Sequence, residues 1–255
     1  MRFAADAWRG RRVWIIGAST GIGAALAQAL LARGAHVALS ARSADKLEAM
    51  ARGHEGAWAL PLDATSAEAL SAAWSSIVGR WGGADLVVCM AGTYTPLRAW
   101  ELTPDRARAT VEANLLSAMY VTAAVLPRLL EQRNAAIAFV ASVAGYRGLP
   151  KALVYGPTKA ALINFAETLY LDVEPKGVGV FLINPGFVET PLTAGNDFRM
   201  PALISAEKAA SEILAGLDRG RFEIHFPRRF TLWLKLLRCL PYRAYFWLVA
   251  RATGA

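Results

Sequence analysis

The chain has 255 residues, of which 55% are hydrophobic, and a formal net charge of +8. It is long enough to bury a substantial core, and no long polar linker or internal repeat divides it, so we expect one compact α/β domain. Two cysteines are too few for a disulfide scaffold and suit a reducing cytoplasm. The first residues show no signal-peptide pattern. No run reaches the roughly 18 apolar residues that a bilayer span needs.

The first predicted unit is a strand, a glycine turn, a helix and a second strand. An apolar run at residues 13–16 leads directly into GASTGIG, and Gly34 closes the apolar stretch that follows, before a second strand at 36–40. Glycines at 17, 21 and 23 let the backbone turn tightly and approach a ligand, and the new helix points its free amides and positive dipole end at the loop. We predict a dinucleotide-phosphate site here; a purely structural glycine turn is the alternative.

The end of the second strand indicates which dinucleotide is preferred. It reads Ser40-Ala41-Arg42, without the Asp or Glu that accepts hydrogen bonds from the ribose of NAD. Arg42 instead offers a planar donor fork suited to the 2′-phosphate of NADP. We therefore predict NADP, with NAD as the second choice. The alternative is that Arg42 merely starts a solvated helix capped by Ser43.

Further short apolar runs predict a doubly wound, Rossmann-type, mostly parallel sheet of seven strands with helices on both faces. The remaining strands are expected near residues 57–60, 85–88, 136–141, 178–183 and 222–226. Ligands of such sheets bind outside the carboxyl ends of the strands. Five residues lie just past predicted strand ends and should converge on one crevice: Gly17, Asp63, Gly92, Ser142 and Gly186.

Tyr155 and Lys159 stand four residues apart in a predicted helix, with Ser142 thirteen residues upstream. Positions i and i+4 share one helix face, so a phenol and an ammonium can meet the same ligand. A cation beside a phenol lowers its pKa, which predicts a proton-transfer site. Pro157 fits a helix that begins near residues 153–155, because proline is tolerated in a first turn. An ordinary amphipathic helix is the alternative.

Together these motifs resemble the short-chain dehydrogenase/reductase family along nearly the whole chain. The glycine loop is similar to the family's T-G-x-x-x-G-x-G, with Ile16 at the position of the threonine, and Cys89-Met90-Ala91-Gly92 replaces Asn-Asn-Ala-Gly. Asn184-Pro185-Gly186 follows the sixth strand, where the family's Pro-Gly turn meets the nicotinamide. The order of the catalytic tetrad is kept in Asn114, Ser142, Tyr155 and Lys159.

The resemblance implies hydride transfer between a nicotinamide and a carbonyl or secondary alcohol. Ser142 would hydrogen-bond the substrate oxygen, Tyr155 would exchange its proton, and Lys159 would lower the tyrosine pKa and hold the nicotinamide ribose. Asn114 would hold a water that relays protons; a buried asparagine satisfied by backbone is the alternative. The implied cofactor contacts, with no metal, are Gly17, Ser19, Thr20, Gly21, Ile22, Gly23, Arg42, Asp63, Ala91, Gly92, Tyr155, Lys159, Pro185, Gly186, Val188 and Thr190.

Two departures from the family pattern support a rival hypothesis. Cys89 and Met90 remove the asparagine side chains that brace the loop and the central sheet, and Ile16 removes a hydroxyl. Cofactor affinity should suffer more than the chemistry, because the tetrad is intact. The rival is a non-catalytic dinucleotide-binding scaffold or redox sensor.

The substrate is less defined than the chemistry. The segment after the Pro-Gly turn, which shapes specificity in the family, has mixed polarity. Tyr94, Tyr146 and Leu149 near the expected mouth favour an apolar or lipid-like substrate, with plain packing as the alternative. The resemblance also implies a homo-oligomer, either a dimer or a tetramer.

Residues 228–255 form a basic, aromatic-rich extension beyond the expected catalytic domain of residues 1–227. The extension carries six basic residues and no acid. On a helical wheel, Thr231, Lys235 and Arg238 form one narrow polar stripe on residues 230–240, and Pro241 should break the helix. The apolar arc could pack on its own domain or a sister subunit, lie on an anionic membrane surface, or bind an acidic protein. Nucleic-acid binding is not expected, since no reading motif occurs.

Overall fold

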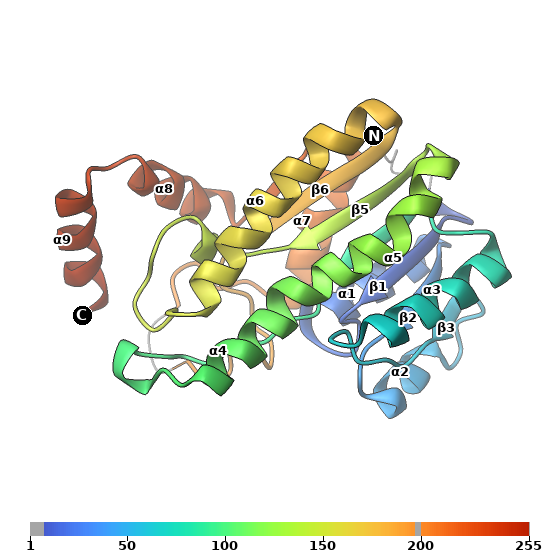
Figure 1. The fold of residues 1–255 in the computed structure, drawn as a ribbon, viewed down its shortest axis with the longest axis horizontal. Coiled ribbons are helices and arrows are strands. Elements are labelled where there is room, and N and C mark those ends of the chain that lie inside the picture. The colour runs from blue at the N-terminus through green and yellow to red at the C-terminus, as the bar shows by residue number, and fades with distance from the viewer. Residues whose placement is uncertain (1–7, 197–199, 255) are drawn as a thin grey trace.

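The computed structural model describes residues 8–196 and 200–254. Its seven strands form one sheet in the order β3-β2-β1-β4-β5-β6-β7, and each neighbouring pair is parallel (Figure 1). This confirms the doubly wound fold, and every strand lies within two residues of its predicted range. The strands are β1 (Arg12–Ile16), β2 (His36–Ser40), β3 (Ala57–Ala59), β4 (Leu86–Cys89), β5 (Ala135–Val140), β6 (Val178–Pro185) and β7 (Glu223–Phe226).

Helices cover both faces of the sheet, as the alternating pattern predicted. Helices α3, α5 and α6 pack on one face, and α1, α2 and α7 on the other (Figure 1). The helices are α1 (Gly21–Ala32), α2 (Ala44–Ala51), α3 (Ala67–Trp81), α4 (Pro104–Val111), α5 (Ser117–Gln132), α6 (Tyr155–Val173), α7 (Ala206–Asp218), α8 (Arg228–Arg238) and α9 (Tyr242–Thr253).

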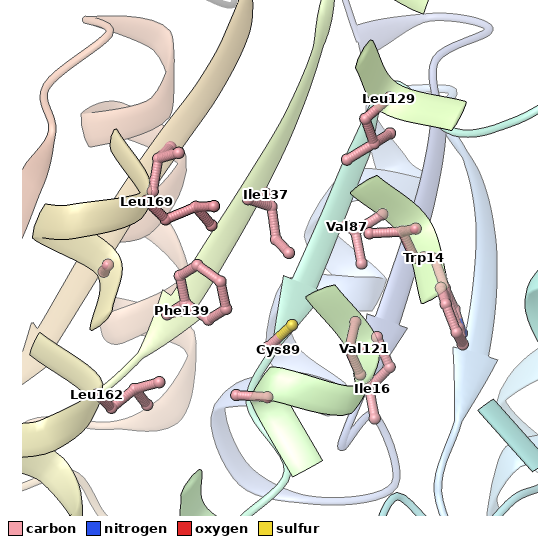
Figure 2. Close-up of a cluster of buried hydrophobic side chains, with 14 of the residues drawn as sticks. Trp14, Ile16, Val87, Cys89, Val121, Leu129, Ile137, Phe139, Leu162 and Leu169 are labelled. Atoms are coloured by element: carbon pink, nitrogen blue, oxygen red, sulfur yellow. The ribbon is translucent and has the colours of Figure 1, made fainter. Parts of the chain in front are cut away.

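The core lies in two layers because successive side chains of a strand point to opposite faces. In β1, Trp14 and Ile16 enter the layer beneath α3 and α5, whereas Val13 and Ile15 enter the layer beneath α1 and α7. Figure 2 shows the first layer, in which Phe139 of β5 lies among side chains from the sheet and its covering helices. The resulting strands are mostly apolar, and His225 is a polar residue inside edge strand β7.

One helical run needs a correction to the expectation about membrane spans. Pro104–Gln132 is continuous through α4, the π-helical turn η3 (Glu112–Leu116) and α5, and by length and mean hydropathy it could cross a bilayer. The sequence did not indicate this helix as a possible span, because polar residues such as Asn114 and Ser117 interrupt its apolar residues. In the fold, Val121, Val125 and Leu129 of this run are buried in the core, so it serves as a core helix.

Candidate functional site

The glycine loop between β1 and α1 is packed too closely for side chains. Gly17 has φ +100°, and a Cβ there would lie 2.8 Å from the amide nitrogen of Ala91. A Cβ on Gly23 would lie 2.1 Å from the carbonyl oxygen of Gly17. Thr20 precedes α1 without a side-chain cap, and the first turn holds no acid. The uncapped amides and the positive helix end therefore fit the phosphates of a dinucleotide.

Loops that are distant in sequence meet this cradle. A Cβ on Gly21 would lie 2.9 Å from the methyl carbon of Thr190, so the segment after β6 lies against the glycine loop. That segment begins at Gly186, whose amide donates to the carbonyl of Phe226 (2.7 Å), and it includes the buried Val188. The structure thus brings together the ends of β1, β4 and β6, as the parallel topology predicted.

The residues that depart from the family pattern are packed in the core. Ile16 and Cys89 are buried in the layer beneath α5, and burial raises the pKa of the Cys89 thiol. Met90 packs with the opposite layer, and a Cβ on Gly23 would lie 2.8 Å from its sulfur. Apolar packing therefore occupies the places of the family's bracing polar side chains.

Arg42 and Asp63 are exposed beside each other at the ends of β2 and β3. The Asp63 carboxylate accepts hydrogen bonds from the amide (2.9 Å) and hydroxyl (2.8 Å) of Thr65. These bonds, and to a smaller degree the charge of Arg42, hold the pKa of Asp63 below its usual value. The position predicted to contact adenine and the one predicted to contact a 2′-phosphate are thus neighbours.

Ser142, Tyr155 and Lys159 converge where β5 ends and α6 begins. Tyr155 is the first residue of α6, as Pro157 predicted. Ser142 accepts a hydrogen bond from the amide of Ala144 (3.1 Å) and is hydrogen-bonded to the Tyr155 side chain. The buried Lys159 ammonium donates to the carbonyl of Val140 (2.9 Å) and lies 5.7 Å from the centre of the Tyr155 ring.

The pKa of Tyr155 does not shift in the predicted direction. Burial raises it to about 12, although the hydrogen bond with Ser142 acts in the opposite sense. The expected lowering by Lys159 is absent because burial lowers the pKa of the lysine itself, to about 8, and its ammonium is directed at Val140. In the protein without ligands, Tyr155 therefore keeps its proton at neutral pH.

Lys159 should make stability depend on pH. Its pKa is about 8 in the folded chain against an ordinary 10.5, so between these values the unfolded chain binds more protons. The unfolding free energy of the wild type, relative to Lys159→Met, should therefore rise with pH across this window, by up to roughly 3 kcal/mol. Denaturant titrations of both proteins over the window measure the slope, and parallel pH profiles would contradict the assignment.

Asn114 is a buried asparagine whose hydrogen bonds are made mainly with backbone, which is the alternative to holding a water. It is 1% exposed in the π-helical turn η3, a geometry frequent at functional sites. Its Oδ1 accepts from the amide of Thr93 (2.7 Å), and its Nδ2 donates to the carbonyl of Thr93 (2.9 Å) and towards the Thr158 hydroxyl (3.4 Å). Backbone therefore satisfies Asn114, which fixes the Gly92–Thr93 loop beside Lys159.

The aromatic residues expected at the mouth divide into two groups. The Tyr94 ring meets Tyr155 edge to face, with 4.9 Å between centroids. Tyr146 instead belongs to the core, and its hydroxyl donates to Glu223 (2.7 Å), which also accepts from Asn184 (2.9 Å). Tyr146 is therefore a packing residue, which was the alternative to a role at the mouth of the site.

Sequence analysis missed Glu223, although it is the only acid in residues 219–255 and so the natural partner of the basic extension.

Comparison with known proteins agrees with the family resemblance seen in the sequence. A family model described as short chain dehydrogenase matches residues 11–199. A Myxococcus xanthus protein described as an uncharacterized oxidoreductase is 34% identical over 235 residues, covering 91% of this chain and 93% of the relative.

Two solved structures share the fold. A short chain dehydrogenase from Burkholderia cenocepacia, solved in complex with NADP, has a TM-score of 0.84 at 24% identity and covers 98% of this chain and 99% of that one. A short-chain dehydrogenase from Streptomyces avermitilis has a TM-score of 0.81 at 23% identity, with 96% and 98% covered. The chain therefore belongs to the short-chain dehydrogenase family and is an oxidoreductase of the kind that works with NAD(P).

Proposed function

We propose that this enzyme is an NADP-dependent carbonyl reductase or alcohol dehydrogenase with Tyr155 as its general acid and base. The observation that carries the proposal is the cluster at the start of α6, where the Tyr155 hydroxyl is hydrogen-bonded to Ser142 and Lys159 lies one helical turn away. The nicotinamide nucleotide supplies or accepts the hydride.

The protein's own residues handle the proton. Ser142 donates a hydrogen bond to the substrate oxygen, and Tyr155 transfers its proton to that oxygen as the carbonyl carbon becomes an alcohol. The phenol is protonated at neutral pH and can act as the acid; because burial raises its pKa to about 12, the transfer needs stabilisation of the phenolate by its neighbours. Lys159 stabilises the phenolate left after transfer once its ammonium turns from the Val140 carbonyl towards the Tyr155 side chain, and Asn114 positions the Gly92–Thr93 loop.

Residues at the ends of the strands hold the cofactor. The glycine loop and the amides of α1 take the phosphates, and Arg42 binds the 2′-phosphate of NADP, with Asp63 beside it on the adenine side. Ala91, Gly92, Pro185, Gly186, Val188 and Thr190 complete the contacts. The tight packing of Gly17 and Gly21 against the Ala91 and Thr190 loops supports this assignment.

Replacing Arg42 should change the choice of cofactor. Arg42→Ala removes a charged donor to a phosphate, so NADPH affinity should fall roughly tenfold to hundredfold while NADH affinity stays level. Calorimetric titration with both nucleotides measures the change. Arg52→Ala, at the exposed C-terminal end of α2, is the matched control. An equal loss for both nucleotides would contradict a phosphate role for Arg42.

We propose an apolar or lipid-like carbonyl or alcohol as substrate, with the Tyr94 ring against Tyr155 as support. The family resemblance supports a homo-oligomer, and the two free cysteines, Cys89 and Cys239, suit a cytoplasmic location.

The substrate proposal is tested by NADPH oxidation by the purified protein with a series of ketones and aldehydes of rising hydrophobicity. Turnover that increases with the apolar content of the substrate is expected, and the absence of turnover with every carbonyl would overturn the proposal.

A further inference from the structure

Helix α8 packs on its own domain through its polar side. Thr231 is fully buried, with its hydroxyl 2.6 Å from Nδ1 of His225 on β7. One turn further on, Lys235 forms an ion pair with Glu223. Two residues of the polar stripe, Thr231 and Lys235, thus lie on the inner side of α8, whereas Arg238 is exposed. Phe230 and Leu234 add apolar contacts with the core, and the Phe230 ring packs against Gly186 and Phe187.

The loop that follows Ser142 holds both C-terminal helices in place. Arg147 donates to the carbonyls of Leu237 (3.1 Å), Arg238 (3.1 Å) and Leu240 (2.7 Å), and so caps the end of α8. Its guanidinium lies 4.1 Å from the centre of the Tyr245 ring, and the Tyr245 hydroxyl donates to the carbonyl of Gly148 (2.7 Å). The orientation of the two helices is therefore fixed by polar contacts with the loop beside the candidate site.

This packing leaves the apolar sides of α8 and α9 exposed. Trp233 is 67% and Trp247 is 64% exposed. The spacing of three and four residues puts the exposed apolar side chains on one stripe of each helix. This outer face of α8 and α9 consists of Leu232, Trp233, Leu236, Tyr242, Phe246 and Trp247.

Basic side chains lie within the same stripes. Arg229 stands three and four residues before Leu232 and Trp233, and Arg243 stands at the same spacing before Phe246 and Trp247. Arg251 stands four residues after Trp247. All three arginines are exposed. The extension carries no acid, so the outer face combines aromatic and aliphatic groups with positive charge alone.

We propose that the outer face of α8 and α9 docks on an anionic lipid surface. Interspersed arginines and tryptophans are the composition of helices that lie in a membrane interface, where the rings enter the acyl boundary and the arginines meet lipid phosphates. A second copy fits less well, because a twofold interface would place the same all-basic patch on both sides.

The position of the outer face gives docking a consequence for the candidate site. In Figure 1, α8 and α9 project from the side of the molecule where β5 and β6 end. Other exposed apolar residues lie in the segments that follow β4, β5 and β6: Trp100, Leu102, Leu153, Leu192 and Leu203. Docking would therefore bring the entrance of the site close to the lipid. This last step rests on the proposed function, whereas lipid binding itself does not.

Vesicle flotation of the full chain at low salt tests the proposal. The wild type should float with phosphatidylcholine vesicles that contain phosphatidylglycerol and bind pure phosphatidylcholine far less. The double variant Trp233→Ser/Trp247→Ser should bind roughly tenfold or more weakly. The triple variant Arg229→Gln/Arg243→Gln/Arg251→Gln should lose about a hundredfold of the preference for anionic vesicles.

The matched control is Leu171→Ser, which removes a 73% exposed leucine from α6 and should leave flotation unchanged. Circular dichroism and turnover of a water-soluble carbonyl distinguish a failure of docking from a failure of folding or of the proposed function. A wild type that ignores anionic vesicles, or tryptophan variants that float as well as it does, would overturn the proposal. So would a dimer in light scattering that the tryptophan variant dissociates, because a second copy would then cover this face.

Discussion

Tyr155→Phe should lower kcat/KM by roughly 10²- to 10⁴-fold, the contribution of a positioned general acid or base. The ring and its edge-to-face contact with Tyr94 remain, and only the hydroxyl that is hydrogen-bonded to Ser142 is removed. Dinucleotide affinity should therefore change little. Steady-state kinetics with NADPH and a carbonyl measure the loss, and calorimetry measures the retained binding.

Tyr170→Phe provides the matched control on the same helix. Tyr170 packs against Phe222, with 5.0 Å between ring centroids, away from Ser142 and Lys159. Its hydroxyl should be dispensable for turnover. If Tyr155→Phe retained wild-type turnover, the proton donor would have to be another group; if it lost dinucleotide binding as well, a structural role for the hydroxyl would explain the result.

Gly23→Ala should have the second-largest effect. The new Cβ would lie 2.1 Å from the carbonyl oxygen of Gly17 and 2.8 Å from the Met90 sulfur, so the loop must shift. Overpacking of this kind costs about 1–3 kcal/mol, more than the helix gains from replacing glycine by alanine. Dinucleotide affinity should fall roughly tenfold to hundredfold, as measured by calorimetry, because the amides of α1 lose their alignment with the phosphates.

Gly79→Ala is the matched control, because it gives the helix-propensity gain of alanine without a steric clash of the added Cβ. Gly79 is exposed in α3, and a Cβ added there would meet no atom within 4 Å. This variant should raise the unfolding free energy by up to about 1 kcal/mol and leave nucleotide binding intact. Equal nucleotide binding by Gly23→Ala and the wild type would remove the glycine loop from the cofactor site.

Local patterns predicted those features that depend on a few neighbouring residues. The strand at Val13, the glycine turn and the start of α6 at Tyr155 follow from short-range apolar spacing, glycine conformations and the position of Pro157. The meeting of the loops after β1, β4 and β6 follows from parallel topology, because successive strand ends meet at one edge.

The sequence by itself determined the order of strands and helices, the edge at which the site forms and the charge of the C-terminal extension, since each is set by composition or by spacing along the chain. Tertiary structure alone decided that Asn114 binds Thr93, that burial raises the pKa of Tyr155, and that α8 turns Lys235 inward towards Glu223. These outcomes depend on which surfaces meet across long stretches of sequence. A helical wheel identifies two faces of a helix, but only the contacts made in the folded chain select the one that is buried.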